Sequence, residues 1–265
     1  MLCRYNIIFD LDETFIGRAN ANRKEDQLVP ADAMTKLQHF TSKFTVPGHG
    51  AQNYTMFIRP HADESFFDFV FENFNVGVIT AADYTYGLNV VKHSMLTKPG
   101  RKLAFFFARE NFKADKYGYG GMKNLNYLFQ QVRPFHFFPC NTIMLDDHPK
   151  VYETNQYNVL RVPPWEVLVK EVPPPLEGDK TPPMNPPPSQ KKFNPKCLED
   201  DVFVTVRKVL QFFVDSLDKS LCTVENQYAP CEHLDKPFMQ DRKPPKNFSQ
   251  KEFGHTIGNW STSEK

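Results

Sequence analysis

Apolar residues fall into two alternating patterns over residues 1–165. Short continuous apolar runs have the length of buried strands, and they cover residues 5–9, 76–80, 103–107, 143–145 and 159–162. Between them lie segments in which apolar residues recur every three or four positions, which is typical of amphipathic helices. Strands that alternate with helices in this way predict an α/β domain with a central, mostly parallel sheet.

The helical spacing is clearest in a few segments. Residues 61–74 gather Phe and Val side chains on one face, and Asp83 is a suitable N-cap for the helix that follows it. Residues 30–44 are expected to form another helix, because Pro30 suits a first turn and apolar residues recur at positions 34, 37, 40 and 44. A short helix is also expected over residues 123–131.

The composition changes after the last expected strand. Half of the 22 prolines lie between Pro163 and Pro195, so residues 166–197 are expected to form a stiff, solvated linker that packs as neither helix nor sheet. Residues 198–218 have one apolar stripe and are expected to form the final helix of the core, with a partner-helix or membrane-surface role as the alternative. Residues 219–265 are polar and expected to be mostly disordered, with a short docking motif as the alternative.

Charge and cysteine content exclude several classes of protein. Lys and Arg (32) nearly balance Asp and Glu (31), and no basic stripe indicates a nucleic-acid partner. The five cysteines have no CxxC spacing, which indicates neither a zinc site nor a disulfide framework and favours a reduced intracellular compartment. The first residues leave no room for a signal peptide, and no apolar run is long enough to span a membrane. A nuclear or cytoplasmic location is therefore expected.

Acidic and hydroxyl residues follow three of the expected strands. Asp10 and Asp12 follow the first strand, Thr80 follows another, and Asp146 and Asp147 follow a third. Parallel sheets bind ligands beyond the carboxyl ends of their strands. These side chains are therefore expected to meet at one edge of the sheet and to form the active site.

The segment that follows the first strand suits phosphoryl transfer. Asp10 can attack phosphorus and form an aspartyl-phosphate, while Asp12 can protonate the leaving alcohol and then deprotonate water. Mg2+ would bridge Asp10 and a phosphate oxygen, and so offset the repulsion between an anionic nucleophile and an anionic substrate. A solvated acidic turn without chemistry is the alternative.

A second acidic segment strengthens this interpretation. Asp146 and Asp147 close another apolar strand, and a hard divalent cation takes oxygen ligands from more than one segment of a chain. His148 has no Cys or second His at ligand spacing. We therefore expect a turn histidine before Pro149 rather than a zinc ligand.

These motifs resemble, in collinear order, those of the small phosphatases that act on the C-terminal domain of RNA polymerase II, the NLI-interacting-factor type within the haloacid-dehalogenase (HAD) superfamily. The resemblance implies a HAD-like, Rossmann-type core over residues 1–165 without a large cap, and it resumes near Leu198. The matching segments are residues 10–14, 58–60, 78–81, 121–125, 145–149 and 162–165.

The resemblance also implies roles for the acidic residues. Asp10 would be the nucleophile, and Asp12 would be the acid/base and a main-chain metal ligand. Asp147 would bind Mg2+, the implied cofactor, and Asp146 would support it. Thr14 would help to orient the site.

Further residues are implied to contact the substrate. Thr80 and Lys123 would bind its phosphate. Tyr86 would line a pocket for a proline beside the phosphoserine, and a tyrosine on the helix surface that packs locally is the alternative. Arg109 resembles part of a family Arg-Glu pair, although its spacing to Lys123 differs. The second aromatic residue of the proline pocket has no clear counterpart, because Asn20 lies near its place.

Three functions remain open. The first is a Mg2+-dependent serine/threonine phosphatase acting on the C-terminal domain of RNA polymerase II or a similar Ser-Pro peptide. The second is a docking module that keeps the fold with little activity, and the third is a phosphatase of metabolites or nucleotides. Retention of Asp10 and Asp12 favours an enzyme over a docking module. The lack of a segment large enough for a closing cap favours a peptide substrate over a metabolite.

Overall fold

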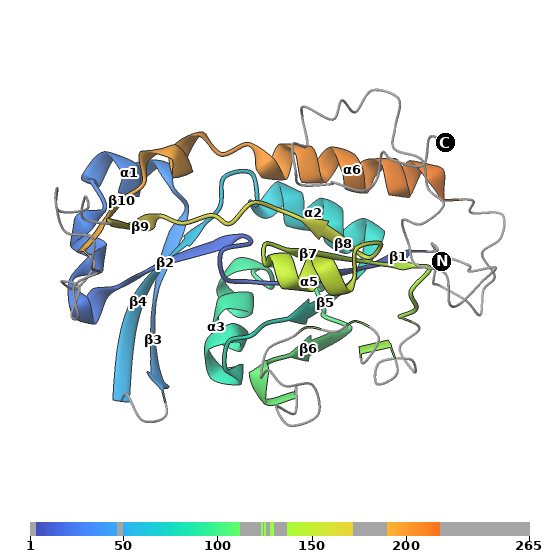
Figure 1. The fold of residues 1–265 in the computed structure, drawn as a ribbon, viewed down its shortest axis with the longest axis horizontal. Helices are drawn as coiled ribbons and strands as arrows, with labels where there is room; N and C mark the ends of the chain where they lie inside the picture. The colour runs from blue at the N-terminus through green and yellow to red at the C-terminus, as the bar shows by residue number, and fades with distance from the viewer. Residues whose placement is uncertain are drawn as a thin grey trace, which may run out of the picture.

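A parallel five-stranded sheet with the order β6-β5-β1-β7-β8 forms the centre of the molecule (Figure 1). It confirms the expected α/β fold with a central parallel sheet. The strands are β1 (Tyr5–Phe9), β5 (Phe74–Ile79), β6 (Phe105–Phe107), β7 (Thr142–Asp146) and β8 (Val159–Arg161). The computed structural model describes residues 4–46, 50–111, 137–171 and 190–217, together with residues 123, 125, 128 and 129.

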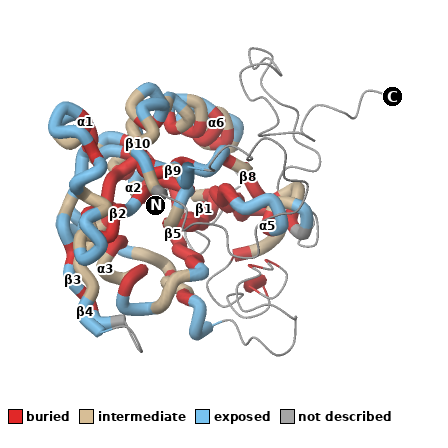
Figure 2. The backbone as a smooth tube through the Cα atoms, turned by 60° about the vertical axis from the view of Figure 1, so that its left-hand side comes forward, coloured by how far each residue is buried: buried red, intermediate tan, exposed pale blue. Residues whose placement is uncertain are grey.

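Strand β1 lies in the middle of this sheet and is buried along its whole length (Figure 2). Ile7 and Phe9 belong to one hydrophobic cluster, whereas Ile8 belongs to a second cluster. Because successive side chains of a strand point to opposite faces, the two clusters lie on the two sides of the sheet. A strand buried on both faces reads as a continuous apolar run, which is why it was recognisable from sequence.

Helices cover both faces of the sheet. The first cluster contains side chains of α2 (Glu64–Asn73), α3 (Tyr84–Ser94) and α6 (Val202–Ser216), and Figure 1 shows α6 running beside α2. The second cluster contains side chains of α5 (Pro149–Thr154). The expected N-cap of α3 is confirmed, since the Asp83 carboxylate accepts the N–H of Tyr86 at 3.0 Å. The helix expected over 123–131 falls largely outside the described residues.

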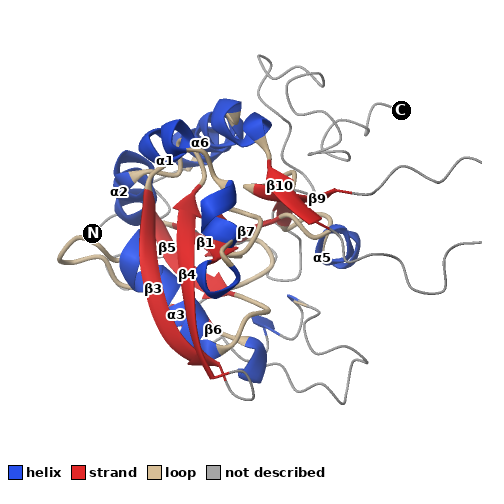
Figure 3. Ribbon diagram, turned by 90° about the vertical axis from the view of Figure 1, so that its left-hand side faces the viewer, coloured by secondary structure: helices blue, strands red, loops and turns tan. Residues whose placement is uncertain are grey.

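A second sheet, of three antiparallel strands, lies between β1 and α2 in the chain. Its order is β2-β4-β3, and Figure 3 shows β3 and β4 side by side. The helix expected over residues 30–44 is therefore wrong in its second half, because α1 ends at Lys36 and residues 40 and 44 lie in β3. The elements are β2 (Ile16–Asn20), the 3-10 turns Ala21–Arg23 and Glu25–Leu28, α1 (Ala31–Lys36), β3 (His39–Val46) and β4 (Gly50–Ile58).

The part of this second sheet formed by β2 and the second half of β4 is covered on both faces, whereas one face of β3 and the start of β4 are exposed. One face places Ile16, Met56 and Ile58 in the cluster that also contains α3. The other face places Ala19 and Phe57 against a third cluster. The buried part of the sheet belongs to the core, and three strands are too few for a separate cap domain.

The third cluster is completed by residues on both sides of the proline-rich segment. It contains Trp165, Val167 and Leu168 from one side, and Cys197 from the other. Strand β9 (Leu168–Glu171) pairs antiparallel with β10 (Gln190–Phe193), and a 3-10 turn over Pro195–Glu199 follows. The expectation that 166–197 packs as neither helix nor sheet is thus wrong at both ends. Residues 172–189 and 218–265 fall outside the described residues, so the linker and tail predictions for them stay predictions.

One buried arginine ties the start of α6 to the loop that follows β1. Arg59 is 1% exposed, and its Nε and Nη2 donate to the two carboxylate oxygens of Asp200, each at 2.8 Å. Its Nη1 donates to the backbone carbonyls of Thr14 at 2.8 Å and Pro163 at 2.9 Å. Because the guanidinium is a rigid fork of donors, these bonds fix three segments in one relative position.

Two expectations from composition meet different outcomes. Cys140 is disulfide-bonded, which the cysteine spacing did not indicate and which does not agree with the expected reduced compartment. Cys197 is a free, buried cysteine, and burial raises the pKa of its thiol to about 11. Within the described part of the chain, no helix has the length and apolar character needed to span a membrane.

The Arg59–Asp200 pair gives a prediction about stability. Asp200→Ala leaves a buried guanidinium without its counter-charge, and we expect it to lower the free energy of unfolding by about 3 kcal/mol. The measurement is urea-induced unfolding. The matched control is Asp201→Ala, because Asp201 is exposed and makes no side-chain capping bond. Equal losses for the two variants would contradict the role given to this ion pair.

Candidate active site

The loop after β1 is a tight turn held by backbone hydrogen bonds. The carbonyl of Leu11 accepts the N–H groups of Phe15 at 3.2 Å and Ile16 at 3.1 Å. Glu13 has φ 60°, in the left-handed region, which costs a non-glycine residue about 1 kcal/mol. Its carbonyl accepts the N–H of Trp165 at 2.7 Å. The turn folds the chain back so that the side chains of residues 10 and 14 face the end of β7.

Lys123 lies between two of the predicted carboxylates. Its Nζ is 2.6 Å from Asp10 Oδ1 and 2.7 Å from Asp146 Oδ2, and all three side chains are buried. Burial alone would lower the pKa of Lys123, but the two carboxylates raise it above its ordinary value. Lys123 is therefore a fixed ammonium at the strand ends, where a phosphate would need positive charge.

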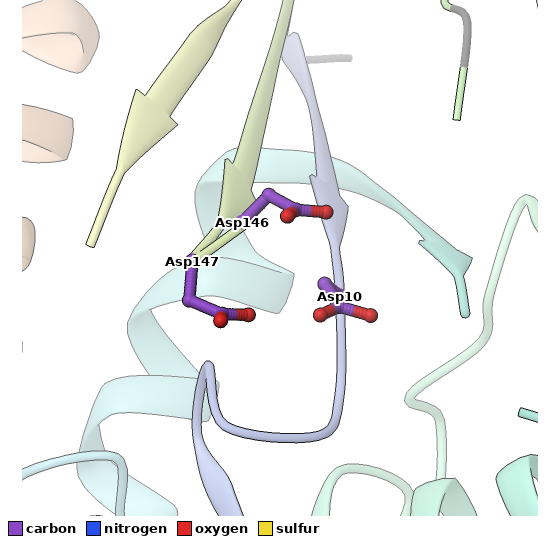
Figure 4. A group of neighbouring side chains, drawn as sticks. All are labelled: Asp10, Asp146 and Asp147. Atoms are coloured by element: carbon purple, nitrogen blue, oxygen red, sulfur yellow. The ribbon is translucent and has the colours of Figure 1, made fainter. Parts of the chain in front are cut away.

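Asp10, Asp146 and Asp147 form a compact group of carboxylates (Figure 4). Each offers an oxygen, and these oxygens lie within 4.8 Å of one another. The Thr14 hydroxyl lies 3.2 Å from Asp10 Oδ2 and 3.1 Å from Asp147 Oδ1, so it joins the two segments. The sequence prediction that β1 and β7 bring these carboxylates together at one edge agrees with this geometry.

Burial and mutual repulsion shift the titration of this group. Burial raises the pKa of Asp10 well above its usual range, Lys123 lowers it, and the neighbouring carboxylates raise it again. Burial also raises the pKa of Asp147, and the charge of Asp146 adds to that effect. A cluster of this kind gains from a cation that is held by its oxygens. The donor set consists of hard carboxylate oxygens, which fits Mg2+.

Both carboxylate oxygens of Asp146 are hydrogen-bonded to other groups of the protein. Its Oδ2 is bound by Lys123, and its Oδ1 accepts the backbone N–H of His148 at 2.8 Å. This arrangement suits the supporting role expected for Asp146 better than that of a metal ligand. His148 caps α5, since its Nδ1 accepts the N–H of Lys150 at 3.2 Å, as expected for a turn histidine.

Thr80 lies at the end of β5 and is 1% exposed. Its backbone N–H donates to Phe107 at 2.9 Å, and its hydroxyl oxygen accepts the N–H of Ala82 at 3.1 Å. Arg109 is exposed in the 3-10 turn Arg109–Asn111, and its backbone N–H donates to Ala82. Arg109 thus lies near the loop after Thr80, but its side chain makes no hydrogen bond to the described residues.

Tyr86 contacts Asp12 directly. Its hydroxyl donates to Asp12 Oδ1, and its side chain is 2% exposed, so it is not a surface residue of α3. Burial raises the pKa of Tyr86 well above its usual range, and Asp12 adds to the shift, so the phenol stays protonated and remains a donor. The proline-pocket role of Tyr86 stays a prediction. Asn20, near the place of the missing second aromatic residue, caps the turn Ala21–Arg23.

Arg18 was missed in the sequence analysis. Its guanidinium lies 5.5 Å from the centre of the Tyr86 ring and 5.9 Å from that of Tyr54. A signal was present, because Arg18 is the single charged residue in a five-residue strand and alternates with the apolar Ile16. Its neighbours come from β4 and α3, however, and that proximity depends on the fold.

A comparison with known protein families identifies the family of this chain. Residues 5–172 match the model of the NLI interacting factor-like phosphatases. This chain belongs to that family. Two viral proteins are similar to this chain. The putative CTD phosphatase-like protein 355R of Invertebrate iridescent virus 3 is 27% identical over 165 residues. The match covers 60% of this chain and 83% of the viral protein. Its counterpart in Invertebrate iridescent virus 6 is 29% identical over 164 residues, covering 60% and 85%.

Solved structures of the CTD phosphatase Fcp1 are also similar to this NLI interacting factor-like protein. One, described as an essential RNA polymerase II CTD phosphatase, matches with a TM-score of 0.46 and 22% identity, over 62% of this chain and 43% of that one. A fission yeast Fcp1 bound to beryllium fluoride matches with a TM-score of 0.44 and 22% identity, over 62% and 42%. The matched part is less than half of each Fcp1 chain.

A cavity of about 550 Å³ lies between the start of α2 and α6. None of the candidate site residues lines it. The chemistry of the described residues is therefore concentrated at the strand ends, and this cavity does not contribute to it.

The Tyr86–Asp12 contact gives a prediction about turnover. Tyr86→Phe removes the donor, and a hydrogen bond to a charged group contributes about 2 kcal/mol, so we expect kcat for an aryl phosphate to fall at least tenfold with a smaller change in KM. Steady-state kinetics at saturating Mg2+ measure both constants. Tyr54→Phe is the matched control, because the Tyr54 ring stacks on Phe44 and makes no described bond to Asp12. An unchanged kcat for Tyr86→Phe would show that Asp12 works without this donor.

Proposed function

We propose that this chain is a Mg2+-dependent phosphatase that removes phosphate from serine or threonine residues of proteins. The observation that carries the proposal is the position of Asp10, with Lys123 at 2.6 Å and the carboxylates of Asp146 and Asp147 beside it. Membership of a phosphatase family supports the reaction class. The names of the viral and Fcp1 relatives support a substrate that resembles the C-terminal domain of RNA polymerase II.

Two carboxylates divide the chemistry in this proposal. A carboxylate oxygen of Asp10 attacks phosphorus, the bond between phosphorus and the seryl oxygen breaks, and Asp12 gives a proton to that leaving oxygen. Asp12 then takes a proton from a water molecule whose oxygen attacks the aspartyl-phosphate. Inorganic phosphate leaves, and Asp10 is regenerated. The hydroxyl of Tyr86 fixes the direction in which Asp12 points.

Mg2+ is proposed to be held by the side chains of Asp10 and Asp147 and by the main-chain carbonyl of Asp12. When bound, it would offset the repulsion between the carboxylates and the phosphate. Asp146 supports the site indirectly, because it holds Lys123 at 2.7 Å. Thr14 keeps Asp10 and Asp147 together through its hydroxyl.

The phosphate of the substrate is proposed to lie between Lys123 and Thr80. Lys123 supplies an ammonium that is already fixed, so little is lost in ordering it on binding. The hydroxyl oxygen of Thr80 accepts a backbone N–H, which leaves the hydroxyl proton for an oxygen of the phosphate. These two donors would orient the phosphorus toward Asp10.

The reaction is tested with an aryl phosphate. We expect hydrolysis that requires Mg2+, stops with a chelator and returns when Mg2+ is restored. We also expect Asp10→Asn to lower kcat by at least a thousandfold, since an amide cannot form the acyl-phosphate. Circular dichroism and thermal unfolding would show that this variant is folded. Full hydrolysis in chelator, or substantial turnover by folded Asp10→Asn, would contradict the mechanism.

The substrate class follows from the second sheet. Because β2 and the second half of β4 pack into the core on both faces, we infer that this sheet is anchored and does not swing over the strand ends to enclose a small molecule. An extended polypeptide can reach such a site, and a proline beside the phosphoserine would lie near Tyr86. A metabolite phosphatase would lack a preference for phosphopeptides, and a docking module would hydrolyse neither class of substrate.

This preference is measured by comparing catalytic efficiencies. We expect kcat/KM for a Ser-Pro phosphopeptide to exceed that for sugar phosphates and nucleotides by at least tenfold. A metabolite that is hydrolysed more efficiently than every phosphopeptide would overturn the protein-phosphatase assignment. Absence of hydrolysis for all substrates, with a folded protein and Mg2+ present, would favour the docking module.

A further inference from the structure

Arg18 extends from the second sheet toward the candidate active site. It lies in β2 opposite Met56 of β4, and it alternates with Ile16, so it points to the face that packs toward α3. Ile16 is buried on that face, whereas Arg18 is exposed. A charged side chain in this position must reach past the packed part of the interface to its open edge.

Two tyrosine rings hold the guanidinium of Arg18 in place. The centre of the Tyr86 ring lies at 5.5 Å and that of the Tyr54 ring at 5.9 Å. The Tyr54 ring is itself stacked on Phe44, with ring centres 5.3 Å apart and planes 5° apart. Cation–π contacts of this kind favour one orientation of an exposed guanidinium, so less freedom is lost when it binds an anion.

Arg18 lies on the same side of the site as Asp12. Tyr86 contacts both residues, since its hydroxyl donates to Asp12 and its ring lies against Arg18. Partial burial of the guanidinium lowers the pKa of Arg18, but the negative charge of Asp12 and the two tyrosines together outweigh this effect and raise the pKa above its ordinary value. A guanidinium has five N–H donors, and its hydrogen bonding to the described residues involves Tyr86. Further donors therefore remain for a ligand.

The position of Arg18 near Asp12 indicates which part of the substrate Arg18 would contact. In the proposed reaction Asp12 protonates the leaving oxygen, so the leaving group lies beside it. For a phosphoprotein the leaving group is the serine or threonine, and the rest of the polypeptide continues from there. The phosphate lies toward Lys123 and Thr80, at the ends of the other strands.

We propose that Arg18 binds a second anionic group of the substrate, carried by a residue adjacent to the one that is dephosphorylated. This inference rests on the proposed protein-phosphatase function and narrows its substrates to acidic or multiply phosphorylated peptides. A carboxylate and a phosphate share the required chemistry, because each accepts two parallel N–H bonds from a guanidinium. Lysine at this position would keep the charge but lose the paired geometry.

The test uses a matched set of phosphoserine peptides of equal length. The residue beside the phosphoserine is glutamine, glutamate or a non-hydrolysable phosphonate analogue of phosphoserine, placed on either side. Kinetic constants are measured for the full chain and for Arg18→Gln and Arg18→Lys. The control is Arg23→Gln, because Arg23 is an exposed arginine in the 3-10 turn that follows β2, and its charge lowers the pKa of Glu25.

We expect the unmodified chain to hydrolyse the acidic peptides about fivefold more efficiently than the glutamine peptide, as is typical of an exposed, oriented charge pair. Arg18→Gln should reduce this ratio to about one, mainly through KM, and Arg18→Lys should retain part of it. Arg23→Gln should leave the ratio unchanged. Raising the ionic strength should weaken the preference, since the contact is exposed.

Several outcomes would overturn the inference. The first is equal catalytic efficiency of the unmodified chain on acidic and glutamine peptides. The second is a preference for acidic peptides that persists in Arg18→Gln. The third is a fall in kcat of Arg18→Gln that is equal for all substrates, which would make Arg18 a positioning residue for Asp12. Dissociation constants for the same peptides, measured by fluorescence anisotropy in chelator, separate this inference from the reaction. Acidic peptides that bind through Arg18 but are not hydrolysed would overturn the proposed function and leave the anion contact supported.

Discussion

The structure depends on the buried guanidinium of Arg59. Its donors reach the loop that carries the candidate nucleophile, the segment after β8, and the start of α6. A charge that is 1% exposed is tolerated only when it is fully paired, so the carboxylate of Asp200 is required wherever Arg59 is retained. This requirement links a residue beyond the family-matched segment to the geometry of the active site.

A second constraint is that polar or positively charged groups lie between the carboxylates at the strand ends. Lys123 separates Asp10 from Asp146, and the hydroxyl of Thr14 separates Asp10 from Asp147. Lys123 lowers the pKa of Asp10, but burial and the neighbouring carboxylates raise it well above its usual range. A cation held by these oxygens would favour the anionic form of Asp10, which is the form that a nucleophile needs.

The sequence predicted the central sheet and the carboxylates well, because both follow from local patterns. A strand buried on both faces is a continuous apolar run, and the acids directly follow it. The sheet of β2, β3 and β4 was missed for a physical reason: Phe40 and Phe44 are four residues apart, and this spacing places them on one face of a helix and also on one face of a strand. The contacts of Tyr86 and Asp200 join residues distant in sequence, so no local pattern reveals them.

The pairing of β9 with β10 has a consequence for how this chain can change over time. Glu171 and Gln190 are partners in this strand pair, so the two ends of the segment between them lie side by side. The intervening segment is therefore closed at its base, and the entropy of closing a loop grows only slowly with its length. Insertions and deletions between these residues alter little of what holds Asp200 against Arg59. The length and composition of this segment are therefore free to change without disturbing the catalytic framework.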